Sequence, residues 1–291
     1  MRRLVFLAAV GLVGFVLVLG CQREPRPPVD TMIDEMMAAR AANSQIPPLT
    51  LTYGDFSVEQ AYRIQDALTA RLVKRGHKVA GYKVGYANPA SQEAWGIAEP
   101  GYGRLYDFQE VPDGGTIAAS DYSAFQIEAE VAFIIGKRIA RRVKTVEDLK
   151  PYVVGVSAAF DIPDGRFRKA EGPEKIADII ASGVGAHRWA IGPIMDPECV
   201  DLGEVVGTIA WNGEHVYCGQ ATAVMGSPWN SLLWLANALI KRGHALEQGD
   251  VVLTGALDKA FTGGPGGKVV GVYVGDCGGL GRVTVTVSDA K

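Results

Sequence analysis

From residue 79 onward, the sequence is a series of short apolar runs that glycine residues separate. The chain contains 36 glycines, and glycine favours tight turns between strands. We predict strands at residues 80–84, 103–106, 125–135, 152–160, 187–191, 205–211, 251–254, 268–274 and 281–287. Because strands outnumber helices in this region, we expect an α+β fold with a mixed or antiparallel sheet.

The preceding residues, 31–80, have a helical pattern. Residues 31–42 are rich in alanine and methionine, and residues 57–75 begin with the capping-box pair Ser57 and Gln60. Two later helices are predicted at residues 173–181 and after Ser227. We therefore expect residues 31–291 to form one domain, in which 31–80 is the helical part and 81–291 the β-rich core.

The N-terminus carries a targeting pattern. Two arginines precede an apolar run at residues 4–19, and Gly20-Cys21 follows, which resembles a bacterial lipoprotein signal. Residues 1–20 would then be a removable signal peptide, Cys21 the lipidated mature N-terminus, and the proline-rich residues 21–30 a tether. This pattern predicts a protein anchored through lipid on the periplasmic side of the envelope, at the outer membrane. The alternative is an uncleaved membrane anchor with a structural cysteine.

Charge and cysteine content exclude several functions. The net charge of -3 gives no basic footprint, so we expect no nucleic-acid partner. Beyond Cys21, three cysteines remain at positions 199, 218 and 277, with a spacing that does not match a zinc site. Buried free thiols are the simplest interpretation.

The most informative run is the strand predicted at residues 125–135. Side chains alternate along a strand, so Glu128 and Glu130 share one face at a separation of about 7 Å, and the apolar Ile127 and Val131 share the other. Two such carboxylates repel each other, and a bound cation would offset that repulsion. A solvated pair on an edge strand is the alternative. Asp161, after the next apolar run, could complete a site of three oxygen ligands, which favours Mg²⁺ or Mn²⁺ over Zn²⁺.

Other polar residues are candidates for substrate contact. Lys83 lies within an apolar, glycine-bounded strand, where it either reaches solvent at an edge or faces an anionic substrate. Arg166, two residues after Asp164, either forms a surface ion pair or binds substrate. Ser182 and Asp178, in the segment DIIASG, either end a helix or bind a substrate carboxylate.

Taken in order, these segments resemble one family, the 2-keto-4-pentenoate hydratase/2-oxohepta-3-ene-dioate hydratase group of the fumarylacetoacetate hydrolase superfamily. The matching segments are GYKVG at 81–85, EPGYGRLYD at 99–107, IEAEVAF at 127–133, FDIPDGR at 160–166, ADIIASG at 177–183, SPWNSLLWLANAL at 227–239 and LEQGDVVLTGAL at 246–257. The resemblance implies a mixed β-roll core with flanking helices, homo-oligomers, and Mg²⁺ or Mn²⁺ held by Glu128, Glu130 and Asp161.

The resemblance also implies an activity, in which the catalytic domain adds water to a small 2-oxo acid, a 2-hydroxydienoate or 2-oxo-enoate, to give a 4-hydroxy-2-oxo acid. Lys83 would transfer protons, while Ser182, Asp178 and Arg166 would bind substrate. Three positions differ from the family pattern. Asp161 stands where glutamate is usual, Ile179 where asparagine is common, and Gly101 where hydratases often carry an aspartate; Glu99 is a possible substitute for that aspartate.

Three other activities remain open at this point. The same enolate chemistry serves a decarboxylase acting on 2-oxo-3-hexenedioate. A carbon–carbon hydrolase of the superfamily needs a histidine that activates water, for which His77 is the nearest candidate. A non-catalytic, lipid-anchored binding protein is the remaining alternative.

Overall fold

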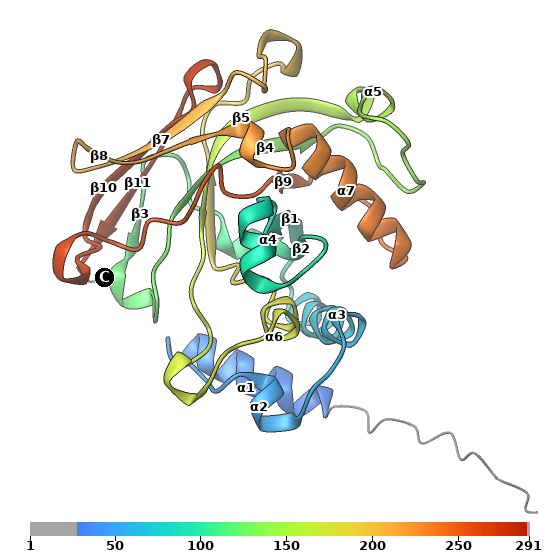
Figure 1. Cartoon of the computed structure of the whole chain (residues 1–291), viewed down its shortest axis with the longest axis vertical. Coiled ribbons are helices and arrows are strands. Elements are labelled where there is room, and N and C mark those ends of the chain that lie inside the picture. Colours follow the sequence, from blue (N-terminus) through green and yellow to red (C-terminus); the bar gives the residue numbers. More distant parts are fainter. Residues whose placement is uncertain (1–27, 290–291) are drawn as a thin grey trace, which may run out of the picture.

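The computed structural model describes residues 28–289, and Figure 1 shows a helical layer beneath a β-rich body. The helices of the lower layer are α1 (Val29–Ala41), α2 (Leu49–Tyr53), α3 (Val58–Lys74) and α6 (Ile176–Ala181). None of the helices within residues 28–289 is long and apolar enough to cross a membrane. The predicted signal peptide, Cys21 and most of the predicted tether lie outside the described residues.

The first sheet has six strands in the order β2-β1-β9-β4-β5-β6. Their bounds are β1 (Val79–Gly85), β2 (Gly101–Tyr106), β4 (Glu128–Ile135), β5 (Val153–Ile162), β6 (Arg188–Ile191) and β9 (Val251–Leu253). Neighbouring strands are antiparallel except β1 and β9, which are parallel. This sheet carries the residues that the sequence singled out.

The second sheet has five strands in the order β3-β11-β10-β7-β8. Their bounds are β3 (Gly115–Ala118), β7 (Val206–Trp211), β8 (Glu214–Gln220), β10 (Gly271–Asp276) and β11 (Arg282–Ser288). It lies beside the first sheet (Figure 1), and Phe160 of β5 packs against Gly275 of β10. The two mixed sheets with covering helices confirm the predicted α+β class and β-roll core.

The remaining elements are α4 (Pro89–Trp95), α5 (Val146–Leu149), α7 (Pro228–Lys241) and short 3₁₀ turns at 107–109, 119–121, 150–152, 169–171, 197–199, 221–223, 265–267 and 278–280. Both predicted N-caps are confirmed: Ser57 and Gln60 form the capping box of α3, and Ser227 accepts a hydrogen bond from Trp229 N in α7. Sequence analysis missed α2, α4, α5, β3 and β8. Asn88-Pro89 at the start of α4 is an N-cap followed by proline, which is a signal that could have found it.

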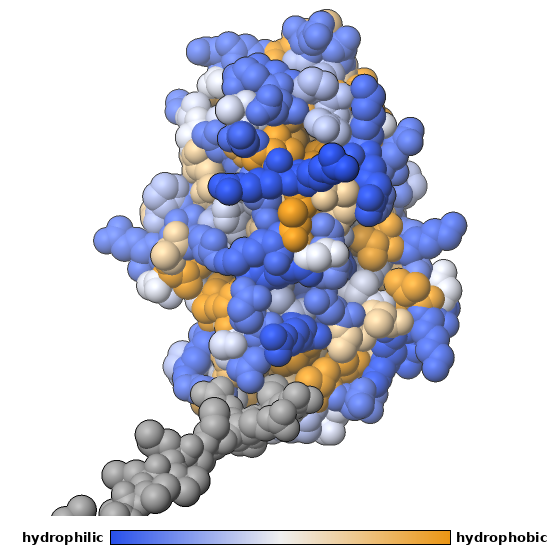
Figure 2. Space-filling view, turned by 90° about the vertical axis from the view of Figure 1, so that its right-hand side faces the viewer, coloured by the Kyte–Doolittle hydropathy of each residue, from blue (hydrophilic) through white to orange (hydrophobic). Residues whose placement is uncertain are grey.

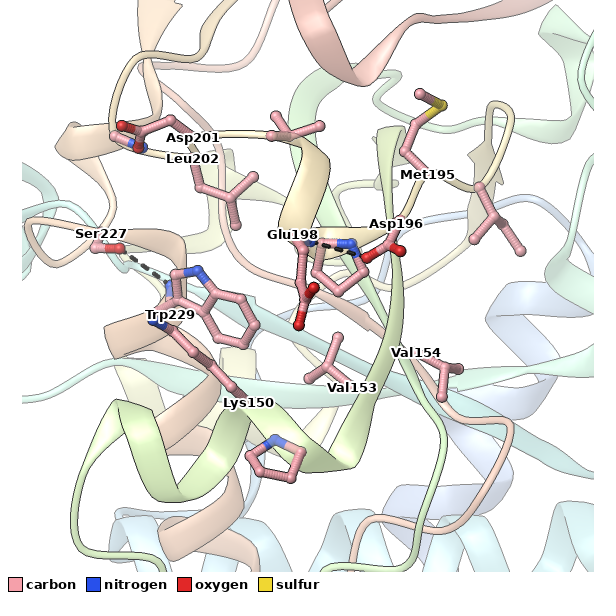
Figure 3. Close-up of a pocket in the computed structure, with 15 residues that line it drawn as sticks. Lys150, Val153, Val154, Met195, Asp196, Glu198, Asp201, Leu202, Ser227 and Trp229 are labelled. Carbon is pink, nitrogen blue, oxygen red and sulfur yellow. Dashed lines mark hydrogen bonds between the residues drawn. The ribbon is translucent and has the colours of Figure 1, made fainter.

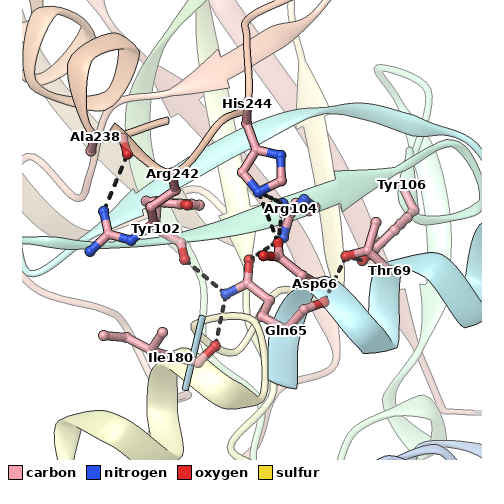
Figure 4. A network of polar contacts seen from close by, with 10 residues as sticks. All are labelled: Gln65, Asp66, Thr69, Tyr102, Arg104, Tyr106, Ile180, Ala238, Arg242 and His244. Atoms are coloured by element: carbon pink, nitrogen blue, oxygen red, sulfur yellow. Dashed lines mark hydrogen bonds and ion pairs between the residues drawn. The ribbon is translucent and has the colours of Figure 1, made fainter. Parts of the chain in front are cut away.

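A buried polar network joins the helical layer to the first sheet (Figure 4). Gln65 of α3 donates to the carbonyls of Tyr102 in β2 and Ile180 in α6, at 3.1 and 2.7 Å. Its own Oε1 accepts from Arg104 Nη1 at 3.1 Å, and Arg104 Nη2 donates to Asp66 at 2.6 Å. Buried polar groups are costly unless paired, so this network holds the end of α6 in one place against β2.

Close backbone packing fixes the same region. An added Cβ at Gly103 of β2 would lie 2.1 Å from the carbonyl oxygen of Gly183, just after α6. Only glycine permits this approach. On the face shown in Figure 2, polar side chains dominate and apolar ones form small separated patches.

Candidate metal centre

Strand register gathers four charged side chains on one face of the first sheet. Glu128 of β4 lies opposite Asp161 of β5, and Glu130 follows two residues after Glu128 on the same face. Lys83 of β1 is in register with Leu253 of β9, which is itself opposite Ala132 of β4, again on that face. Lys83 nevertheless forms an ion pair with Asp161 across the two intervening strands. The sheet must therefore curl toward this face.

Glu128, Glu130 and Asp161 form a group of potential metal ligands. One carboxylate oxygen from each lies within 4.8 Å of the others, and among residues 28–289 no other group of at least three such side chains was found. Glu130 and Asp161 are fully buried, while Glu128 is half-buried at the opening. Glu130 Oε2 accepts from Gly255 N at 2.7 Å, but Glu130 Oε1 and Asp161 Oδ1 are buried without a hydrogen-bond partner. Buried carboxylate oxygens without donors fit a divalent cation bound by oxygen ligands.

The electrostatics of the group favour the same conclusion. Burial raises the pKa of Glu128 to about 8, with Lys83 opposing the shift and Asp161 adding to it. Burial and the neighbouring carboxylates Asp161 and Glu128 also raise the pKa of Glu130 well above its usual range. These side chains therefore resist ionisation together, and a cation would stabilise the fully ionised form.

Lys83 supplies the only cation that touches this carboxylate group in the described part of the chain. Burial lowers its pKa, but Asp161, Glu128 and Glu130 together raise it above the ordinary lysine value. Lys83 is 2% exposed, so the alternative of a lysine reaching solvent at a sheet edge is wrong. Lys83 is a fixed positive charge beside the metal ligands.

The group opens into a cavity of about 360 Å³. Its wall includes Lys83, Glu128, Arg166, Ser182 and Ile179. Of the three predicted metal ligands, Glu128 therefore lies at the cavity wall, and Glu130 and Asp161 lie buried beside it. Two of the predicted substrate contacts, Arg166 and Ser182, line the same cavity. No histidine of the described chain lines this cavity.

Arg166 is held on the cavity wall by buried neighbours. Its Nη1 lies 3.0 Å from Asp164 Oδ2, and its Nη2 donates to His187 Nδ1 at 2.9 Å. Burial and the nearby Arg166 lower the pKa of His187 to about 2, so the imidazole is neutral and accepts this bond. Because Arg166 is 6% exposed, its ion pair is not the surface pair that the sequence alternative described.

The two polar residues of the segment at 177–183 lie in different places. Ser182 ends α6 and lines the cavity, with its hydroxyl donating to Ile179 O at 2.9 Å. Asp178 is fully buried, does not line the cavity, and accepts from Thr50 N, Thr50 Oγ1 and Lys175 N at 2.7 to 2.8 Å. Asp178 thus ties α6 to α2, and its predicted substrate contact has no support in the geometry.

The position of the missing family aspartate, Gly101, is crowded by side chains from α6 and the residues after it. Gly101 begins β2 opposite Gly85, and an added Cβ there would lie 3.3 Å from Ile180 Cγ1. Glu99, the predicted substitute, is exposed and lines a separate surface cavity with Trp234 and Arg242. The structure does not bring Glu99 to the metal ligands.

Sequence reasoning missed several residues of the cavity. Tyr86 and Trp95, whose rings lie 5.1 Å apart, contribute an aromatic wall from the segment around α4. Tyr86 and Val184 both line the cavity with positive φ angles of 59° and 54°, a strained conformation that often accompanies functional sites. Glu174 also lines it, and burial raises the pKa of this carboxyl. Of these residues, only Tyr86 could have been predicted from the sequence, because it directly follows the segment at 81–85.

A larger cavity of about 1220 Å³ lies elsewhere, beside the N-terminus of α7 (Figure 3). Its carboxylates serve local turns: Asp196 accepts from Glu198 N and Asp201 from Gly203 N, both at 2.9 Å. The lysine at its edge, Lys150, lies over the Trp229 ring. No group of potential metal ligands converges in this cavity. The candidate site is therefore identified by the chemistry of its side chains and not by the volume of the cavity.

Comparison with known proteins gives a family. Residues 106–288 match the family described as fumarylacetoacetate (FAA) hydrolase, C-terminal. A 2-keto-4-pentenoate hydratase of Paraburkholderia xenovorans (strain LB400) is 30% identical over 229 residues, covering 78% of this chain and 84% of the relative. A 4-oxalocrotonate decarboxylase of a Pseudomonas species is 30% identical over 210 residues, covering 72% and 80%.

A solved structure agrees with the fold. The 4-oxalocrotonate decarboxylase from Pseudomonas putida G7, complexed with magnesium and adipate, superposes with a TM-score of 0.83 at 26% identity, covering 89% of this chain and 97% of that one. The likeness spans the helical layer as well as the β-rich core.

The raised carboxyl pKa values predict a pH-dependent stability. Without metal, the folded chain retains protons on Glu128 and Glu130 that the unfolded chain releases above about pH 4.5. The two protonated carboxyl groups therefore contribute their full share to stability below that pH, and this share is lost as pH rises through about 8. We expect the Tm in EDTA to fall over this window, less so in Glu128→Gln. We also expect Mn²⁺ to raise the Tm by about 5 °C or more, and most strongly at the alkaline end.

Differential scanning fluorimetry across the pH range measures both effects. Glu204→Gln, on a loop outside the cavity, is the matched control and should follow the wild type. A Mn²⁺-induced Tm rise that survives in Glu130→Gln would contradict the ligand assignment.

Proposed function

The chain belongs to the fumarylacetoacetate hydrolase superfamily, and from this we propose that it is a metal-dependent hydratase. Its substrate would be a small 2-hydroxydienoate or 2-oxo-enoate, and its product a 4-hydroxy-2-oxo acid. The observation that carries the proposal is the buried group of Glu128, Glu130 and Asp161, with Lys83 beside it, at the base of a cavity. Several relatives that match most of the chain are 2-keto-4-pentenoate hydratases.

The cofactor that we propose is Mg²⁺ or Mn²⁺. Three carboxylates are hard oxygen ligands, which suit these ions, and two solved relatives contain magnesium or manganese. When bound, the cation would act as a Lewis acid on a 2-oxo acid and stabilise negative charge on its C2 oxygen.

The chain's own residues would orient the substrate and its charge. Arg166 and Ser182 place a guanidinium and a hydroxyl on the cavity wall, where they can bind the substrate carboxylate. Lys83 Nζ, fixed by Asp161, adds positive charge near the developing enolate oxygen and can hold or deliver a proton there. The aromatic wall of Tyr86 and Trp95 would exclude water from one side of the substrate.

The hydration needs a group that moves protons along the carbon chain. C5 of the dienol takes up a proton to give the conjugated ketone, water then adds at C4, and C3 takes up a proton. Gly101 supplies no carboxyl group, and Glu99 lies on another surface. We assign this role to Glu174, whose raised pKa brings it closer to neutral pH and which lines the same cavity.

Decarboxylation of 2-oxo-3-hexenedioate is the second candidate, and one feature of the cavity favours it. Lys169 and Lys259 line the cavity in addition to Arg166, so a second carboxylate of the substrate would also find a cation. A carbon–carbon hydrolase has less support, because His77 lines a different cavity, where its ring lies tilted against Phe108 with the ring centroids 4.4 Å apart.

The first test is turnover of 2-hydroxypenta-2,4-dienoate by the purified protein with Mg²⁺ or Mn²⁺. We expect loss of the dienol ultraviolet absorbance, a product heavier by one water in mass spectrometry, and no turnover in EDTA. Glu128→Ala should lose metal binding in calorimetry together with activity. Metal-dependent loss of CO₂ from 2-oxo-3-hexenedioate, with no turnover of the dienoate, would replace hydratase with decarboxylase.

Glu174→Gln tests the proton-transfer assignment. Because the amide cannot exchange a proton, we expect kcat to fall by a factor of about 100, within the range for general acid–base catalysis, while metal affinity stays unchanged. Glu99→Gln is the matched control and should retain wild-type kcat. Equal kcat values for Glu174→Gln and the wild type would remove Glu174 from the mechanism.

We also propose that Cys21 is lipidated and anchors the protein to the periplasmic side of the outer membrane. The support is the order of basic, apolar and Gly-Cys segments at residues 1–21. Metabolic labelling with a fatty acid analogue should mark the wild type and not Cys21→Ala, and labelling of both would refute the assignment. The family resemblance further supports a homo-oligomer, which light scattering of the purified protein would measure.

A further inference from the structure

A second, mainly apolar cavity lies between α1 and α3, apart from the metal ligands. Its volume is about 200 Å³, and Met36, Leu68, Leu72 and Phe108 form much of its wall. The methionine and leucine side chains come from the facing sides of the two helices. Such a wall suits the apolar body of a small ligand, and methionine adapts readily to different shapes.

The polar groups of this cavity are all cationic or neutral. Arg40, Arg75, His77 and Arg166 line it, and no aspartate or glutamate does. Arg40 Nη2 donates to the carbonyl of Ala186 at 2.6 Å, but within residues 28–289 no ion pair joins Arg40 or Arg75 to a carboxylate. Arg166 is paired with Asp164, but Arg40 and Arg75 bring positive charge that no carboxylate of the cavity wall offsets.

Arg166 is buried and Arg40 is half-buried, which makes this imbalance of charge significant. Burial and the nearby Arg166 lower the pKa of Arg40 to about 10, which reflects two guanidinium groups close together in a poorly solvated place. Arg166 is 6% exposed, and its Nε has no hydrogen-bond partner. An anion would relieve the repulsion and supply the missing acceptor.

Together, these features define one chemical class of ligand. A neutral apolar molecule would leave Arg40 and Arg75 without a counter-charge, and a polyanion would not match the apolar wall. We propose that this cavity is a binding site for a small monocarboxylate with an apolar body, whose carboxylate contacts Arg40 and Arg166 and whose chain lies against Leu68 and Leu72. The site is separate from the metal ligands, although Arg166 and Ser182 line both cavities.

Calorimetric titration of the purified protein with hexanoate, in EDTA, tests the proposal. We expect saturable binding, and binding of hexan-1-ol at least tenfold weaker because it has the same apolar body without the charge. Arg40→Met keeps an apolar stem but removes the guanidinium, and should weaken hexanoate binding roughly tenfold, as expected for a hydrogen bond to a charged group. Arg40 and Arg75 line this cavity and not the cavity beside the metal ligands or the one at Glu99. Weaker hexanoate binding in variants of these two arginines would therefore place the ligand in this cavity.

Two further variants keep the result decisive. Arg75 is exposed at the rim, so Arg75→Met should fold normally and weaken hexanoate binding even if Arg40→Met does not fold. Lys74→Met removes an exposed cation from the same helix outside the cavity and should bind as the wild type does. The proposal is overturned if hexanoate shows no saturable binding up to about 10 mM, if hexanol binds equally well, or if neither arginine variant binds hexanoate more weakly.

Discussion

Repulsion among three buried carboxylates is the constraint on which the site depends. Glu128, Glu130 and Asp161 lie on one face of the first sheet because of strand register, and the interior solvates them poorly. One lysine, Lys83, offsets a single negative charge of the three. An arrangement of this kind is unfavourable for folding alone, since replacing such groups by apolar residues is often neutral or stabilising. Its presence in the centre of a sheet is therefore best explained by the cation that it can bind.

The helical layer matters because it places the opposite wall of the cavity. Gln65 holds the carbonyl of Ile180, and the glycine contact between Gly103 and Gly183 brings the next turn against β2. Ser182 lies between these two attachments, so its position relative to the ligands is determined by backbone contacts. The family-matched region begins at residue 106, whereas Lys83 and Gln65 precede it. The site is thus completed by a part of the chain outside the matched core.

The sequence predicted the parts of this site that depend on local periodicity. Alternation along the predicted strand at 125–135 put Glu128 and Glu130 on one face, and the apolar run at 152–160 placed Asp161 directly after it, where the observed β5 includes it. Contacts between distant segments were not predictable in this way. Glu99 and Glu174 are both glutamates outside helices and strands, and nothing in the sequence separates them. Only Glu174 lines the cavity, because the fold brings the loop before α6 to the cavity wall. The uncompensated Arg40 likewise becomes visible only when α1 and α3 pack together.

The choice between hydration and decarboxylation depends on where protons and charges lie beyond the shared enolate. Hydration needs an acid–base group along the carbon chain, whereas decarboxylation needs a place for a second carboxylate. In this chain glycine at position 101 supplies no acid–base group, and Ile180 packs tightly in the direction that a side chain there would take. Lys169 and Lys259 meanwhile add positive charge to the cavity wall, and Glu174 adds a carboxyl group there. The balance between Glu174 and the two lysines, and not the metal ligands, is therefore what would separate the two reactions.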